Sequence, residues 1–213
     1  MTDSHRSPES AANFGKLWAA QSISAFGSRI TRTALPIVAI LTLGASPAEV
    51  ALLGAMAVGP GVFVGLLLGG YIDRAAKRPL LIGADLVRAA VLMAVPLAAW
   101  TGWLDIVQLC AVAAIVGAAT AVFQIADNAY LPALVGKAGL VDANSKLEST
   151  EALAEIGGPS AAGFLIGLLT APIAIVVDAV SYLVSAAFLV AIRAPERPAE
   201  PEKDKPTLWR DLV

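Results

Sequence analysis

Six long apolar stretches constrain the fold of this chain more than any other feature of its sequence. An α-helix needs roughly 20 residues to cross a bilayer, and each stretch reaches that length. The six windows span residues 17–43, 50–71, 80–100, 106–129, 147–169 and 173–192. Only 15% of the residues are charged, whereas soluble proteins average about 25%. The sequence therefore predicts an all-α, polytopic membrane protein with six transmembrane helices.

The basic residues between the windows predict how the bundle is oriented. Cytoplasmic loops are enriched in Lys and Arg. Here basic residues precede the first window, follow the sixth, and lie in the connections after the second and fourth windows, while the other three connections contain none. We expect a multi-pass protein of the cell (inner) membrane with both termini cytoplasmic. Residues 1–16 would form a cytoplasmic N-terminal segment, 17–192 the bundle, and 193–213 a cytoplasmic linker truncated at the start of an amphipathic helix.

The two halves of the chain share a pattern of glycine, proline and aspartate. Gly59-Pro60 in the second window corresponds to Gly158-Pro159 in the fifth, and a proline stands six residues before both Asp85 and Asp178. This match predicts a 3+3 inverted repeat, although glycine and proline are frequent in membrane helices and also match by chance. Four further glycines have the spacing of closely packed helices. They are Gly65, Gly69, Gly163 and Gly167.

Several functions are excluded by what the sequence lacks. A net charge of −2 argues against nucleic-acid binding. His5 is the only histidine and Cys110 the only cysteine, so neither a zinc site nor a catalytic thiol has partners at suitable spacing. No phosphate-binding loop follows the glycines of the second window. We therefore expect that the protein is not an enzyme and binds no cofactor. Any transport that it performs would use an energy source other than ATP.

A charged loop joins the second and third windows, where two glycines and four charged residues separate apolar runs. Its pattern resembles the major facilitator superfamily motif G-x-L-a-D-r-x-G-r-k, with Tyr71 for Leu and Ala76 for the second Gly. The matching residues are Gly69, Asp73, Arg74, Lys77 and Arg78. Segments 17–21, 130–135 and 178–183 are similar to the drug:proton antiporter branch of macrolide and enterobactin exporters. The resemblance covers the N-terminal half of that architecture.

The resemblance implies a second six-helix bundle, either a missing C-terminal half or a homodimer partner. It also implies that Asp73, a basic residue of the loop and Asp127 form a charge relay that controls conformation. The expected function is proton-coupled efflux of drug-like or siderophore-like small molecules by alternating access. The alternative is a non-transporting six-helix subunit or an inactive transporter fragment, which the abrupt end at Val213 favours.

Charged residues inside the windows cost about 2.5 to 3.5 kcal/mol each on insertion, so they must be paired or functional. Arg29 and Arg32 share a helical face in the first window. They either line a water-filled pathway that attracts an anionic or polar substrate, or form a structural ion pair with Glu155 or Asp127.

Other charged residues within the windows include Glu155, Asp178, Asp85 and Arg88. Glu155 is a candidate for proton exchange unless an arginine holds it ionised. Asp178 is either a proton site or a hydrogen-bonding partner of a neighbouring helix. Asp85 and Arg88, three residues apart, are expected to form a local structural pair.

Overall fold

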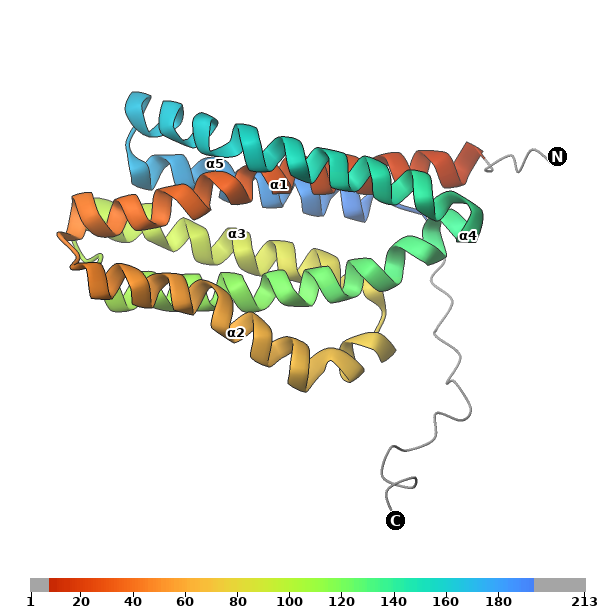
Figure 1. Cartoon of the computed structure of the whole chain (residues 1–213), viewed down its shortest axis with the longest axis horizontal. Helices are drawn as coiled ribbons and strands as arrows, with labels where there is room; N and C mark the ends of the chain where they lie inside the picture. Colours follow the sequence, from red (N-terminus) through yellow and green to blue (C-terminus); the bar gives the residue numbers. More distant parts are fainter. Residues whose placement is uncertain (1–7, 194–213) are drawn as a thin grey trace, which may run out of the picture.

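The computed structural model describes residues 8–193 of the chain as a bundle of α-helices (Figure 1). The five helices of this part are α1 (Pro8–Leu43), α2 (Pro47–Arg74), α3 (Lys77–Thr101), α4 (Ile106–Leu168) and α5 (Ala171–Val190). Each is long and apolar enough to cross a membrane, and the described residues contain no strand. The prediction of an all-α membrane bundle is confirmed. The linker predicted after residue 193 lies outside the described residues.

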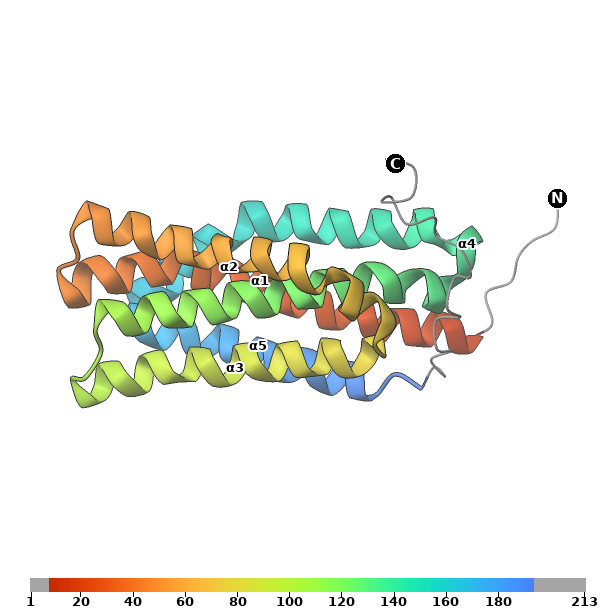
Figure 2. The ribbon, with the colours of Figure 1, turned by 90° about the horizontal axis from the view of Figure 1, so that it is seen from below.

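Helix α4 accounts for the difference between six expected helices and five observed ones. Gly136 interrupts it with φ +69° and ψ 168°, a conformation that glycine adopts without steric cost. The chain folds back there, so that the first arm (residues 106–135) and the second arm (137–168) run in opposite directions along the bundle (Figures 1 and 2). The predicted windows 106–129 and 147–169 both lie in α4, because helix continues on either side of one glycine where a longer loop was expected.

Local signals set the other helix ends. Ser46 caps α2, and its backbone N–H donates to Glu49 Oε2 at 2.7 Å while its own Oγ accepts from the Glu49 N–H. Asp105 caps α4 by accepting from the Gln108 N–H at 2.7 Å. Gly102, in the left-handed region, ends α3. These signals keep the connections short, so that successive helices run antiparallel.

One end of the bundle collects the basic residues of the connections, and we call it the basic end. It holds the start of α1, the α2–α3 connection, the turn of α4 and the end of α5 (right in Figure 1). Its Lys and Arg residues are Lys16, Arg74, Lys77, Arg78, Lys137, Lys146 and Arg193. The connections at the opposite end, residues 44–46, 102–105 and 169–170, contain none.

The core is divided into two apolar clusters with polar side chains between them. The cluster near the opposite end includes Leu92 of α3, and the cluster near the basic end includes Leu81 of the same helix. Between these positions on α3 lie Asp85 and Arg88, which are almost completely buried. Ser28 of α1 reaches this layer through its hydrogen bond with Tyr182, whose ring lies against Arg88. A polar layer therefore crosses the middle of an otherwise apolar bundle.

The closest helix contacts use different glycines from those predicted. A Cβ added at Gly117 of α4 would overlap the backbone of Ala57 in α2, and one at Gly27 of α1 would overlap Asp178 of α5. Among the described residues, the predicted packing role is not found for four glycines, because no atom lies within 4 Å of a Cβ added to any of them. These four are Gly65, Gly69, Gly163 and Gly167.

Candidate functional site

A polar cavity of about 450 Å³ lies between α1 and the two arms of α4, and Arg88 of α3 also lines it. Helix α1 contributes one face of side chains, including Gln21, Arg29 and Arg32. The first arm of α4 contributes Asp127, and the second arm contributes Glu151. Four helical segments therefore place acids, bases and amides around one space, inside a bundle whose outer surface is apolar.

Arg29 is held by two acids of the second arm of α4. Its guanidinium forms ion pairs with both Glu151 and Glu155, which lie one turn apart. The Arg29 side chain is 11% exposed, whereas the two glutamates are more than half exposed. Gly158 packs against the base of the Arg29 side chain, where a Cβ would overlap it. Of the two acids that the sequence offered as partners, Arg29 contacts Glu155, and because Arg29 also lines the polar cavity its role in a substrate pathway stays a prediction.

Arg32, almost one helical turn beyond Arg29, has no such partner. It is exposed, and among the described residues it forms no ion pair or hydrogen bond. Its side chain lines the polar cavity and also a second, apolar cavity of about 710 Å³ between α1, α2 and the first arm of α4. The lining that the two cavities share consists of Ser28, Arg32, Thr120 and Gln124. Arg32 therefore stands at the junction of the two cavities.

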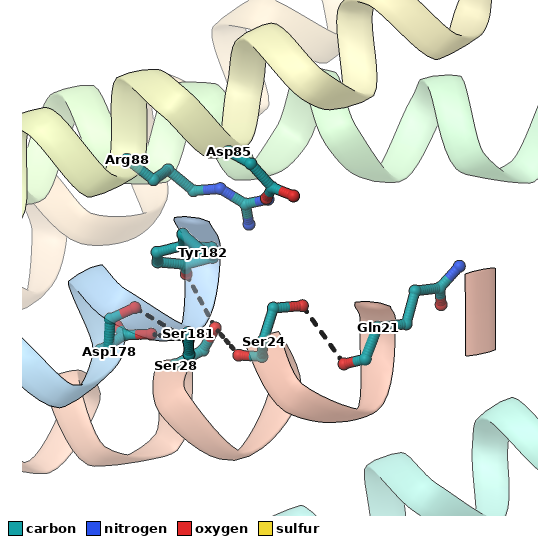
Figure 3. A network of polar contacts seen from close by, with 8 residues as sticks. All are labelled: Gln21, Ser24, Ser28, Asp85, Arg88, Asp178, Ser181 and Tyr182. Carbon is teal, nitrogen blue, oxygen red and sulfur yellow. Dashed lines mark hydrogen bonds and ion pairs between the residues drawn. The ribbon is translucent and has the colours of Figure 1, made fainter. Parts of the chain in front are cut away.

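The polar layer contains an enclosed arginine (Figure 3). Arg88 pairs with Asp85 on the same helix, and both are buried, so the predicted structural pair is confirmed. The guanidinium lies 4.6 Å from the ring centre of Phe123 and 4.1 Å from that of Tyr182. Such cation–π contacts strengthen when desolvated. The aromatic partners were missed, because no sequence pattern relates α3 to α4 and α5.

Asp178 is fully buried on α5, where it faces α1. Its Oδ1 accepts a hydrogen bond from Ser181 Oγ at 3.1 Å, and Gly27 leaves room for this carboxylate against α1. One turn along α5, the Tyr182 hydroxyl shares a 2.8 Å hydrogen bond with Ser28 (Figure 3). Asp178 therefore takes part in the contact between α1 and α5, and it also lines the apolar cavity.

The charged loop tethers helix ends at the basic end. Lys77 Nζ donates to the Ile72 and Ala75 carbonyls at 2.7 and 2.9 Å, at the C-terminus of α2. Arg78 donates from Nε to the Leu189 carbonyl at 2.9 Å, near the end of α5. Cations at a helix C-terminus satisfy free carbonyls and oppose the helix dipole.

The other two charged residues of the loop, Asp73 and Arg74, are not seen to cap a helix in the described part of the structure. Arg74 is exposed, and the side chain of Asp73 lies outside the described part of the structure. Asp127 accepts a hydrogen bond from Gln21 Nε2 at 2.5 Å and lies in the polar cavity. Its contact is thus with α1, and the charge relay with Asp73 stays a prediction.

Comparison with known proteins agrees with this architecture. Residues 3–206 match the model of a major facilitator family described as transmembrane secretion effector. Two relatives from Streptococcus pyogenes, one of them from a serotype M6 strain, are each named Macrolide efflux protein A. Each is 26% identical over 203 residues, which cover 93% of this chain and 49% of the relative. The chain spans about half the length of these relatives. No solved structure matches it.

The family match extends over almost the whole sequence and agrees with the apolar helices and with the charged connection between α2 and α3. It confirms the resemblance found in the sequence, and it indicates a family of transporters and not of enzymes. This chain belongs to the transmembrane secretion effector family of the major facilitator superfamily.

Proposed function

We propose that this chain forms the N-terminal six-span bundle, arranged as a 3+3 inverted repeat, of a secondary active transporter that exports drug-like or siderophore-like small molecules. The two arms of α4 would supply the fourth and fifth spans. The basic end would face the cytoplasm, because connections rich in Lys and Arg are retained there. The opposite end, which has no Lys or Arg in its connections, would face outward in the cell membrane.

The observation that carries this proposal is the pair of adjoining cavities inside the bundle. Their volumes, about 450 and 710 Å³, lie in the range of small-molecule sites. Polar and charged groups line the first, and mainly apolar side chains line the second, which suits an amphipathic substrate. The relatives named as macrolide efflux proteins support the same class of function.

Transport by alternating access would require a second bundle that rocks against this one. The partner is either a C-terminal half or a second copy of the chain. Together with Gly69 and Asp127, the loop residues Asp73, Arg74, Lys77 and Arg78 are proposed to bias the conformation at the basic end. The contacts of Lys77 and Arg78 with the ends of α2 and α5 give such a loop a mechanical connection to two helices.

Proton coupling is proposed for Asp178, and for Glu155 in a conformation in which its ion pair with Arg29 is broken, because the arginine favours the ionised glutamate. The ion pair of Arg29 with Glu155 ties α1 to the second arm of α4. Protonation of Glu155 would break one of the two ion pairs of Arg29, leave the pair with Glu151, and allow the second arm of α4 to move. Asp178, at the contact of α1 and α5, would act in the same way on a different pair of helices.

The test is an accumulation assay in cells that express the native gene, with a radiolabelled macrolide and a labelled siderophore as probes. Expression should lower the accumulation of at least one probe, and a protonophore should abolish the difference. Asp73→Asn should abolish export while membrane insertion is retained, and full export by this variant would overturn the role of the loop. Equal accumulation with and without the gene would contradict the proposed function.

An immunoblot of native membranes against an N-terminal epitope distinguishes the two sources of the second bundle. A band near 21.8 kDa indicates that this chain works with a partner or as a dimer. A band of about twice that mass indicates a single polypeptide with two bundles.

A further inference from the structure

One charged side chain is accessible in the apolar cavity. Three ionisable residues line it: Arg32, Asp178 and Tyr182. Asp178 is fully buried and accepts a hydrogen bond from Ser181, and Tyr182 is 1% exposed and bonded to Ser28. Arg32 is exposed. Among the described residues of this lining, it is the charged group that a ligand can reach.

The other two arginines inside the bundle already have counter-charges. Arg29 pairs with Glu151 and Glu155, and Arg88 pairs with Asp85. Arg32 forms no ion pair within the described chain, and a cation within a membrane span normally requires one or a water-filled site. A guanidinium also binds carboxylate-like groups through two parallel hydrogen bonds. The free guanidinium is therefore suited to an anionic ligand.

The surroundings of Arg32 divide into a polar side and an apolar side. At the junction of the cavities, Thr120 and Gln124 lie four residues apart on the first arm of α4 and line the same space as Arg32. Gln124 is exposed, and its amide can donate to an anion. The wall that α2 contributes is apolar, and it includes Leu53 and Val62.

We propose that the apolar cavity binds amphipathic organic anions, with a carboxylate or sulfonate on Arg32 and Gln124 and the apolar part between α2 and the first arm of α4. This inference rests on the proposed transport function and names the substrate class of the same cavities. It selects anionic amphiphiles over cationic ones of similar size, since the accessible charge of the cavity is positive.

Two fluorescent probes that differ only in one charged group provide the test. Anilinonaphthalenesulfonate carries a sulfonate, and phenylnaphthylamine is the same skeleton without it. Binding is measured to the native gene product in nanodiscs, with the signal of empty nanodiscs subtracted. Arg32→Gln should weaken sulfonate binding roughly tenfold, because one charge-assisted contact is lost, and should leave binding of the neutral probe unchanged. Arg32→Lys keeps the charge and should retain most of the affinity.

Two control variants locate the effect. Gly54 lines the apolar cavity and has no atom within 4 Å of an added Cβ, so Gly54→Leu should fill the space and weaken binding of both probes. Lys137→Gln removes an exposed positive charge at the turn of α4 and should change neither affinity.

Three outcomes would overturn the inference. They are equal binding of the sulfonate to wild type and Arg32→Gln, an equal loss of both probes in Arg32→Gln, and a loss of sulfonate binding in Lys137→Gln as large as in Arg32→Gln. The accumulation assay in cells tests the proposed transport function and is independent of these binding measurements. Sulfonate binding at Arg32 without export in cells would support this site and overturn only the proposed function.

Discussion

Arg88 and Arg32 both lie within membrane-spanning helices, but their surroundings differ in every respect that matters for a charge. Arg88 is 4% exposed, pairs with Asp85 and lies over two aromatic rings. Arg32 is exposed at the junction of two cavities and forms no ion pair among the described residues. Arg29 is intermediate, since it is mostly buried but pairs with half-exposed acids. The comparison teaches that partners and burial, more than position along a helix, separate a structural charge from one available to a ligand.

The largest expected effect comes from removing the counter-charge of the enclosed arginine. Asp85→Ala leaves Arg88 buried without an acid, which should lower the free energy of unfolding by about 3 to 5 kcal/mol. The measurement is the thermal unfolding midpoint of the purified protein in detergent. The double variant Asp85→Ala/Arg88→Met should recover part of the loss. A single variant as stable as the wild type would mean that the pair does not hold the polar layer together.

A middle-sized effect is expected where α1 packs on the second arm of α4. Gly158→Ala places a methyl group against the base of Arg29, and the resulting displacement should cost about 1 to 3 kcal/mol. Gly163→Ala on the same arm is the matched control, because its methyl group meets open space and alanine favours helix. The same unfolding measurement compares the two. Equal stabilities would show that the close approach at Gly158 is not required.

The smallest effects on stability are expected for the two arginines of α1, and they should differ between Arg29 and Arg32. Arg29→Gln should cost roughly 0.5 to 1 kcal/mol, because its partner acids are partly solvated. Arg32→Gln should change stability by less than about 0.5 kcal/mol. Unfolding curves for both variants, recorded in parallel, check the order. If Arg32→Gln lowered stability more than Arg29→Gln, Arg32 would have a structural role, and it would no longer differ from Arg88 in that respect.

Much of the bundle could be predicted because the bilayer simplifies the problem. Apolar runs near 20 residues have few alternatives to a spanning helix, and capping residues such as Ser46 and Asp105 mark their ends. The i, i+3 spacing of Asp85 and Arg88 allowed their pairing to be predicted without tertiary information. The windows 106–129 and 147–169 predicted a connection in the region of Gly136, but the sharpness of the turn depends on backbone geometry that a glycine permits without requiring.

The site depended on contacts between helices far apart in the sequence. The hydrogen bond of Asp127 to Gln21 was not predicted, and the glycines with regular spacing contact no other helix within the described residues. The sequence by itself determined the helices, the basic end and the presence of charges within the spans, because each follows from local hydropathy and charge. Only the tertiary structure decided that Arg29 is paired, Arg88 enclosed and Arg32 free, because the rotation of each helix and the packing of its neighbours set which side chains meet.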